Sequence, residues 1–79
     1  RTPRPVTVQV VSADKPGLLA TMSSTFNEHG INISEASCRS LDDDRALNTF
    51  RINVLDVNQL QKLIRALQKL NGVFAVQRM

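Results

Sequence analysis

A strand–helix–strand pattern that occurs twice in succession constrains the fold of this chain more than any other feature. Pro5–Ser12 and Ala46–Leu55 alternate apolar and polar residues, and each stretch is followed by a helical pattern. Ile31–Ser40 and Val73–Met79 then have the composition of strands. Alternation with a period of two indicates half-buried strands, whereas apolar residues three and four positions apart indicate amphipathic helices. The element order is therefore βαββαβ.

Two glycines mark equivalent boundaries in the two halves. Gly30 and Gly72 each follow a helical pattern, where a glycine in the left-handed conformation commonly ends a helix. A strand–helix–strand crossover is right-handed, and two interleaved crossovers give the split βαβ arrangement. We therefore predict an α+β fold, a ferredoxin-like βαββαβ sandwich. Its four-stranded antiparallel sheet would have the order 4-1-3-2, with both helices on one face.

The same periodicity predicts which side chains face the core. Strands bury every second residue and amphipathic helices bury one stripe. The apolar residues with this spacing are Val6, Val8, Val10, Phe50, Ile52 and Val54 in the strands, Leu18, Leu19, Met22 and Phe26 in the first helix, and Leu60, Leu63, Ile64, Leu67 and Leu70 in the second. The open face of the sheet would carry Thr7, Gln9, Thr49, Arg51 and Asn53.

The second predicted strand contains a change of phase. Its apolar residues begin with Ile31 and Ile33 and continue at Ala36 and Cys38. A period-two pattern changes phase only where the strand has an extra residue, so we predict a bulge near Ser34–Glu35. We expect Cys38 to be a small buried hydrophobe rather than a reactive thiol.

Polar residues outside these patterns belong to loops and helix ends. Leu41–Arg45 reads as a hairpin loop, and its consecutive Asp42–Asp44 lack the alternating ligands of a calcium loop. Asp56 followed by Gln59 is the acidic variant of a capping box at the start of the second helix. His29 is expected to be a solvated residue at the end of the first helix.

The candidate ligand site lies between the first strand and the first helix. Asp14 is a residue type that caps helix N-termini, Pro16 is tolerated in a first helical turn, and Gly17 lets the backbone be approached closely. Together they predict a helix N-terminus with unbonded N–H groups, which suits a small carboxylate or phosphate. An ordinary turn with a helix cap remains the alternative interpretation.

Length and charge limit the class of protein. The 79 residues make one domain, with residues 1–5 read as the end of a linker and residues 6–79 as the folded part. A single cysteine permits no internal disulfide and no cysteine metal cluster. Neither a membrane-spanning run nor a secretory signal is recognisable, so we expect a cytoplasmic location and no membrane contact. The net charge of +3 is mild and is not by itself typical of nucleic-acid binding.

The residues do not assemble into a recognisable catalytic group. Nucleophilic catalysis needs a nucleophile beside a base and an orienting group, and no such set can be assigned. We therefore expect no catalytic residue, no metal and no cofactor in this chain. Lys62, Arg65 and Lys69 on the second helix are candidates for contact with an RNA backbone, although a solvated helix face is the more common explanation of such residues. Base stacking on the sheet is not expected, because Phe50 belongs to the inward set.

Four segments in order carry a resemblance to a known family. They are DKPGLL after the first strand, GINI after the first helix, LxxLIRxLxxLxGV along the second helix, and the closing VQRM. With these segments the chain resembles an ACT domain over nearly its whole length from Val6 onward. It is most similar to the C-terminal ACT domain of Rel/Spo-type (p)ppGpp synthetase/hydrolases. ACT domains of amino-acid biosynthetic enzymes such as phosphoglycerate dehydrogenases share the DxPGLL and GINI elements and are the alternative.

The resemblance implies a regulatory module that performs no chemistry itself. Such domains commonly pair and bind amino acids at the interface. The parent chain would then be a GTP pyrophosphokinase and (p)ppGpp hydrolase of the stringent response, regulated by an amino acid, by dimerisation or by its other domains, or through contact with ribosome or tRNA. The implied ligand residues are Asp14, Pro16, Gly17, Leu18, Leu19, Asn32 and Ile33. The implied homodimer would pair through the second strand, at Glu35, Ser37 and Arg39.

Overall fold

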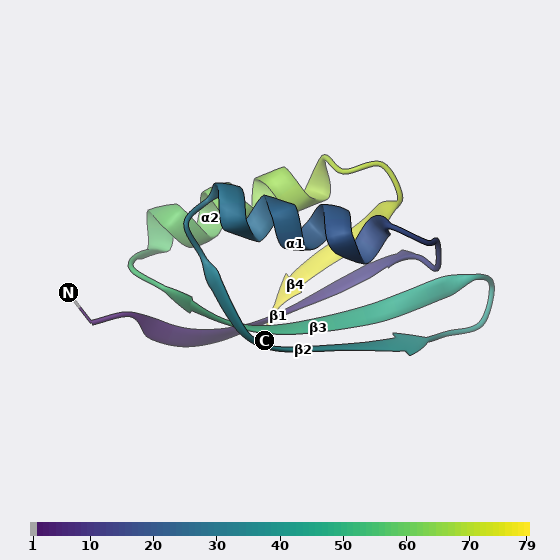
Figure 1. Ribbon diagram of the computed structural model, residues 1–79, viewed down its shortest axis with the longest axis horizontal. Helices are drawn as coiled ribbons and strands as arrows, with labels where there is room; N and C mark the ends of the chain where they lie inside the picture. Colours follow the sequence, from purple (N-terminus) through teal and green to yellow (C-terminus); the bar gives the residue numbers. More distant parts are fainter. Residues whose placement is uncertain (1) are drawn as a thin grey trace.

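The computed structural model describes residues 2–79 and has the predicted βαββαβ order (Figure 1). The sheet has the order β2-β3-β1-β4, with every neighbouring pair antiparallel, and both helices lie on one face. This confirms the predicted ferredoxin-like sandwich with strand order 4-1-3-2. The elements are β1 (Arg4–Ala13), α1 (Leu18–Glu28), β2 (Asn32–Ser40), β3 (Arg45–Val54), α2 (Val57–Gln68) and β4 (Val73–Arg78). Of the predicted linker, Arg1 lies outside the described residues, and Arg4 and Pro5 already belong to β1.

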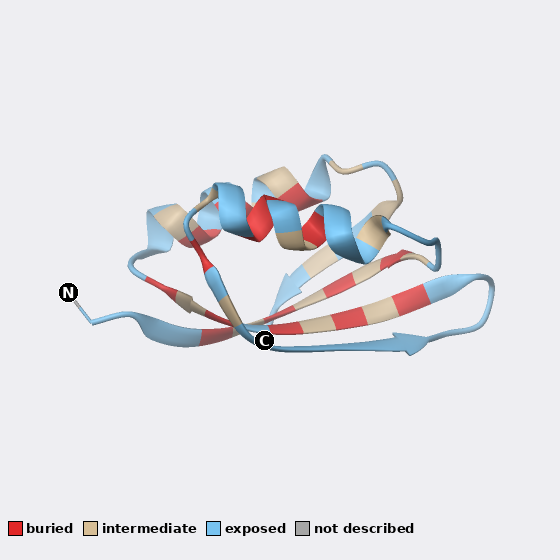
Figure 2. Cartoon of the chain, viewed as in Figure 1, coloured by how far each residue is buried: buried red, intermediate tan, exposed pale blue. Residues whose placement is uncertain are grey.

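The core lies between the helices and the central strands. Buried residues alternate with mostly half-buried ones along β1 and β3, as the red and tan bands in Figure 2 show. Phe26 of α1 and Phe50 of β3 are both fully buried, and their ring centroids are 4.7 Å apart. Burying a large apolar side chain of this kind contributes about 1.5–3 kcal/mol. The helix α2 contributes Leu60, Leu63 and Leu67, as predicted.

The buried stripe of α1 differs from the prediction at Leu19. This side chain is 45% exposed, because the helix begins at Leu18 and its core face continues through Met22 and Phe26. Thr25 is buried instead, next to Phe26 on the same face. Its hydroxyl donates to the carbonyl of Thr21 at 3.0 Å, and this hydrogen bond satisfies the polar group in the core.

The edge strand β2 carries the predicted bulge but not the predicted burial. The register against β3 shifts between Ile33 and Glu35, which confirms the bulge. The prediction that Ala36 and Cys38 turn inward to the core was wrong, since both are exposed. Figure 2 shows β2 pale blue along nearly its whole length, and the strand lies at the edge of the sheet.

The helix α2 begins with the predicted cap. The N–H of Gln59 donates to Asp56 Oδ1 at 2.8 Å, and Gln59 Oε1 accepts the N–H of Leu55 at 2.7 Å. The Nε2 group of Gln59 also donates to the carbonyl of His29 at 3.1 Å, which joins the start of α2 to the end of α1. The prediction that Gly72 ends α2 was wrong, because the helix ends at Gln68. Gly72 lies in the turn that follows, with φ 97°, where the N–H of Val73 donates to the carbonyl of Leu70 at 3.2 Å.

Candidate functional site

The turn between β1 and α1 is shaped by Pro16 and Gly17. The N–H of Leu18 points back to the carbonyl of Lys15 at 3.4 Å, and Gly17 has φ 83° and ψ −16°. These angles and the preceding proline describe a type II turn, in which the third residue must adopt a positive φ. The carbonyl of Gly17 then accepts both the N–H and the hydroxyl of Thr21, at 3.0 and 3.1 Å. Gly17 is therefore the residue that caps α1.

The predicted capping role of Asp14 is wrong, and so is the placement of Pro16 inside the first helical turn. Both residues precede the cap at Gly17, and no side chain caps α1. The carboxylate of Asp14 instead accepts a hydrogen bond from Ser40 Oγ at 2.9 Å. Its N–H donates to the carbonyl of Asp44 at 2.8 Å. The contact with Ser40 joins residues 26 positions apart in sequence, so no local pattern could have predicted it.

The turn keeps an open surface with unbonded backbone donors. A Cβ placed on Gly17 would meet no atom within 4 Å. Among residues 2–79, no backbone carbonyl accepts the N–H of Leu19 or Ala20 in the first turn of α1. These donors lie at the positive end of the helix dipole, which favours an anionic group. Leu18 is half-buried and packs against the core, while the next side chain, Leu19, is exposed.

The other predicted ligand residues, Asn32 and Ile33, lie away from this turn. Asn32 pairs with Asn53, which itself pairs with Pro5 at the beginning of β1. The Gly17 turn follows the opposite end of β1. The 11 residues of α1, about 16 Å at 1.5 Å per residue, separate the two groups. A single copy of the chain therefore does not bring the two halves of the predicted ligand site together.

Three predicted interface residues lie on the face of β2 that points away from the helices, namely Glu35, Ser37 and Arg39. They face the β3 residues Arg51, Thr49 and Leu47, respectively. All three are exposed, and β2 has no neighbouring strand on its outer edge. A shallow depression of about 230 Å³ lies beside them on the open face of the sheet. An exposed strand of this length offers backbone groups to another strand.

The remaining predicted residues are on the outer face of α2. Lys62, Arg65 and Lys69 are exposed, as expected from the helical pattern. No group of three or more His, Cys, Asp or Glu side chains in residues 2–79 is arranged to hold a metal ion, and this includes Asp42–Asp44. Within the same residues, neither helix is long and apolar enough to cross a membrane.

The profile of the ACT domain family matches residues 1–78 of this sequence. The chain belongs to the ACT domain family. A GTP pyrophosphokinase from Myxococcus xanthus is 51% identical over 75 residues, which make up 95% of this chain and 10% of that protein. This ACT domain therefore corresponds to about a tenth of the length of that relative.

Solved structures agree on the fold of the ACT domain. The crystal structure of the ACT domain from the GTP pyrophosphokinase of Chlorobium tepidum superimposes with a TM-score of 0.84 at 24% identity, covering 99% of this chain and 100% of that one. The small subunit of acetolactate synthase from Thermotoga maritima gives 0.81 at 21% identity, covering 95% of this chain and 47% of that one. At such identities the likeness concerns the fold alone.

Proposed function

We propose that this ACT domain is a regulatory module of a GTP pyrophosphokinase, a (p)ppGpp synthetase/hydrolase, and that it binds a small amino acid at a site built by two copies. The observation that carries the proposal is the open turn at Gly17, where the N–H groups of Leu19 and Ala20 have no acceptor among residues 2–79. The 51% identity to a GTP pyrophosphokinase supports the choice of parent enzyme.

Pairing through β2 accounts for the separation of the two groups of ligand residues. In an antiparallel pair of β2 strands with Glu35 opposite Arg39, Ser37 lies at the centre. Asn32 then lies opposite the β2–β3 hairpin of the second copy, and the bulge near Ser34 shifts this position only locally. That hairpin is bonded to the Gly17 turn through Ser40 and Asp14. The turn of one copy and Asn32 of the other would thus line one site.

The groups gathered there match an amino acid. The unbonded N–H groups of α1 would receive its carboxylate, as helix N-termini do with anions. The Asn32 amide oxygen and the Asp14 carboxylate would accept from its ammonium group, and the exposed Leu19 would contact an apolar side chain. Binding would regulate the parent enzyme only by favouring one of its states, with about 1–3 kcal/mol of coupling being typical.

The test is a titration of the 79-residue chain with valine, isoleucine, leucine and serine. We expect saturable changes in the amide NMR signals of Gly17, Leu18, Leu19 and Asn32 for at least one of them. The N-acetylated form of the same amino acid should bind at least about tenfold more weakly, because it lacks the ammonium group. Unchanged signals at millimolar amino acid would contradict the proposal.

Contact with RNA through α2 is the second candidate function. Lys62, Arg65 and Lys69 are exposed and separated by about one turn of helix, so they can follow a phosphate backbone. This function predicts binding to structured RNA that weakens steeply as salt increases. Binding at low salt that is unaffected by Lys62→Ala and Lys69→Ala would contradict it.

A further inference from the structure

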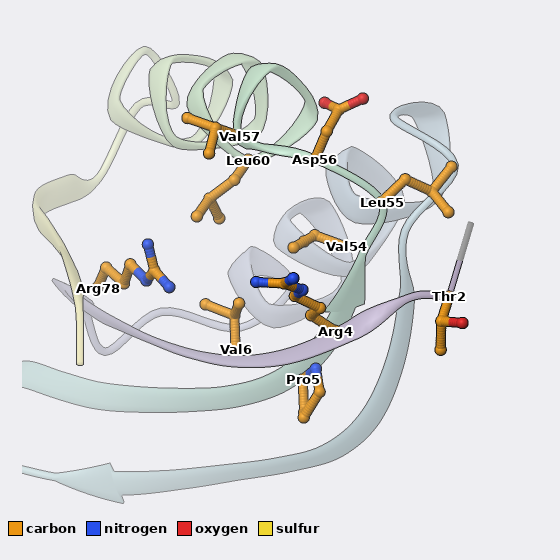
Figure 3. Close-up of a pocket in the computed structure, with 10 residues that line it drawn as sticks. All are labelled: Thr2, Arg4, Pro5, Val6, Val54, Leu55, Asp56, Val57, Leu60 and Arg78. Atoms are coloured by element: carbon orange, nitrogen blue, oxygen red, sulfur yellow. The ribbon is translucent and has the colours of Figure 1, made fainter.

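A second cavity of about 710 Å³ opens at the N-terminal end of α2, against β1, β3 and β4 (Figure 3). Its floor is apolar and buried, since Val6, Val54 and Leu60 are each at most 7% exposed. Part of its rim is also apolar but exposed, with Leu55 at 49% and Val57 at 61%. We call this cavity the α2 groove. A volume of this size is within the range of ligand pockets, about 300–1,000 Å³.

Two arginines from different strands extend into the α2 groove. Arg4 of β1 is on the same side of the sheet as Val6, and Arg78 of β4 is opposite the inward-facing Val8. Figure 3 shows the two guanidinium groups directed over the apolar floor from separate strands. Within residues 2–79, no carboxylate forms an ion pair with either arginine. Two guanidinium groups that face a shared space favour a partner with negative charge.

The N-terminus of α2 alone would not produce a preference for a negatively charged partner. Asp56 caps α2, and its Oδ1 atom accepts the N–H of Gln59 at 2.8 Å. Asp56 is also among the residues that line the groove, and its carboxylate offsets the positive end of the helix dipole. Attraction for an anion therefore depends on Arg4 and Arg78, whose planar guanidinium groups bind carboxylates with two parallel hydrogen bonds.

We propose that the α2 groove docks a protein segment in which acidic residues stand next to aliphatic ones. An aliphatic side chain would cover the floor and the exposed Val57, and flanking carboxylates would bind Arg4 and Arg78. Charge complementarity with Arg4 and Arg78 favours an acidic occupant, and the exposed aliphatic rim favours a protein segment over nucleic acid, since a phosphate backbone would leave that rim in water. An inorganic anion would use the arginines but not the rim. The matched region makes up only 10% of the Myxococcus xanthus relative, and the contact would join this domain to another part of its parent chain.

The α2 groove is distinct from the Gly17 half of the proposed amino-acid site. The Gly17 turn follows Ala13 at one end of β1, whereas Arg4 is at the other end of this 10-residue strand, about 30 Å away at 3.3 Å per residue. If amino-acid binding fails, the amide signals of Gly17, Leu18 and Leu19 stay unchanged on addition of the amino acid. If the groove proposal fails, the signals of Val57 and Leu60 stay unchanged on addition of the peptide.

The test uses the 79-residue chain and the peptide acetyl-Glu-Leu-Asp-Leu-Glu-amide as probe. We expect saturable changes in the amide signals of Val57 and Leu60, and binding at least about tenfold weaker for acetyl-Gln-Leu-Asn-Leu-Gln-amide. Arg4→Gln and Arg78→Gln should each weaken the acidic peptide by about fivefold to tenfold. Arg51→Gln, which removes an exposed arginine from the open face of the sheet, should leave binding unchanged.

Several outcomes would overturn the proposal. Equal affinity for the neutral peptide would show that the arginines do not recognise it. Displacement of the peptide by succinate or phosphate at the same concentration would identify a small-anion site. Self-association that disappears in Arg78→Gln without any peptide would identify a second copy as the occupant. Thermal unfolding of each variant verifies folding, and Arg78→Lys, which keeps the charge but not the paired hydrogen bonds, should bind with intermediate affinity.

Discussion

The hydroxyl of Ser40 donates a hydrogen bond to the carboxylate of Asp14 at 2.9 Å, and this contact ties the end of β2 to the turn before α1. The carbonyl of Asp44 accepts the N–H of Asp14 at 2.8 Å, which adds a second tie to the same hairpin. The edge strand proposed to pair and the turn proposed to bind a ligand are therefore directly connected. Two hydrogen bonds thus connect the end of β2 and its hairpin to Asp14, which precedes the Gly17 turn.

Replacing Ser40 by alanine tests this connection. The lost hydrogen bond is exposed, so the free energy of unfolding should fall by only about 0.5–1 kcal/mol. The amide signals of Asp14 and Gly17 should nevertheless shift and broaden, because the turn loses one of its two ties. Ser24→Ala, at an exposed position of α1, is the matched control and should leave these signals in place. Unchanged turn signals in Ser40→Ala would show that the backbone contact with Asp44 alone fixes the turn.

A side chain at position 17 should destabilise the domain through backbone strain alone. Gly17 has φ 83° and open space around its Cβ position, so Gly17→Ala meets no clash. We expect a loss of about 1–2 kcal/mol, measured by chemical unfolding, because an alanine in the left-handed region is disfavoured. Gly17→Asn should cost less, since asparagine tolerates this conformation better. Equal losses for the two variants would mean that contacts, and not φ, determine the effect.

The fold could be predicted from the sequence because its signals are local. Alternation in β1 and β3, the helical stripe of α2 and the phase change near Ser34 each depend on residues within a few positions of one another. Such patterns report which face of an element is buried. They also fix the strand order, since two interlocked crossovers leave few arrangements of four strands.

The site was only partly predictable, because its contacts join distant residues. In sequence, Asp14 resembles a helix cap. In the structure Gly17 caps α1 instead, and the Asp14 carboxylate accepts a hydrogen bond from the Ser40 hydroxyl. Cys38 has an inward phase, but it lies on the edge strand β2 and is exposed. The α2 groove needs both ends of the chain, since Arg4 and Arg78 are 74 positions apart (78 − 4). No local sequence pattern indicates that Arg4 and Arg78 line the same groove.

Gln59 should contribute more to stability than its place on the surface of α2 indicates. Its side chain accepts the N–H of Leu55 at 2.7 Å and donates to the carbonyl of His29 at 3.1 Å. One residue therefore connects the start of α2 to the end of α1. Gln59→Ala should lower the free energy of unfolding by about 1–2 kcal/mol, as expected for a lost cap and a lost tertiary hydrogen bond. Gln68→Ala, at an exposed position of the same helix, should change it by less than about 0.5 kcal/mol. Similar losses in the two variants would contradict the bridging role.

Dimerisation through β2 can be tested by reversing charges at Glu35 and Arg39. If the two face each other across the pair, Arg39→Glu brings carboxylates together and should weaken the dimer by about fivefold or more, measured by sedimentation equilibrium. Glu35 also faces Arg51 within one chain, so Glu35→Arg alone would disturb the domain itself. Arg39→Glu is therefore the cleaner single variant.

The double variant Glu35→Arg with Arg39→Glu restores the opposite charges across the proposed pair and should recover most of the lost affinity. Arg65→Glu changes the net charge equally on the exposed face of α2 and should leave the dimer intact. A dimer is also expected to raise the unfolding temperature as protein concentration increases, and Arg39→Glu should reduce that dependence. If Arg39→Glu dimerises as well as the natural chain, the copies pair through another surface. The Gly17 turn and Asn32 would then belong to separate sites.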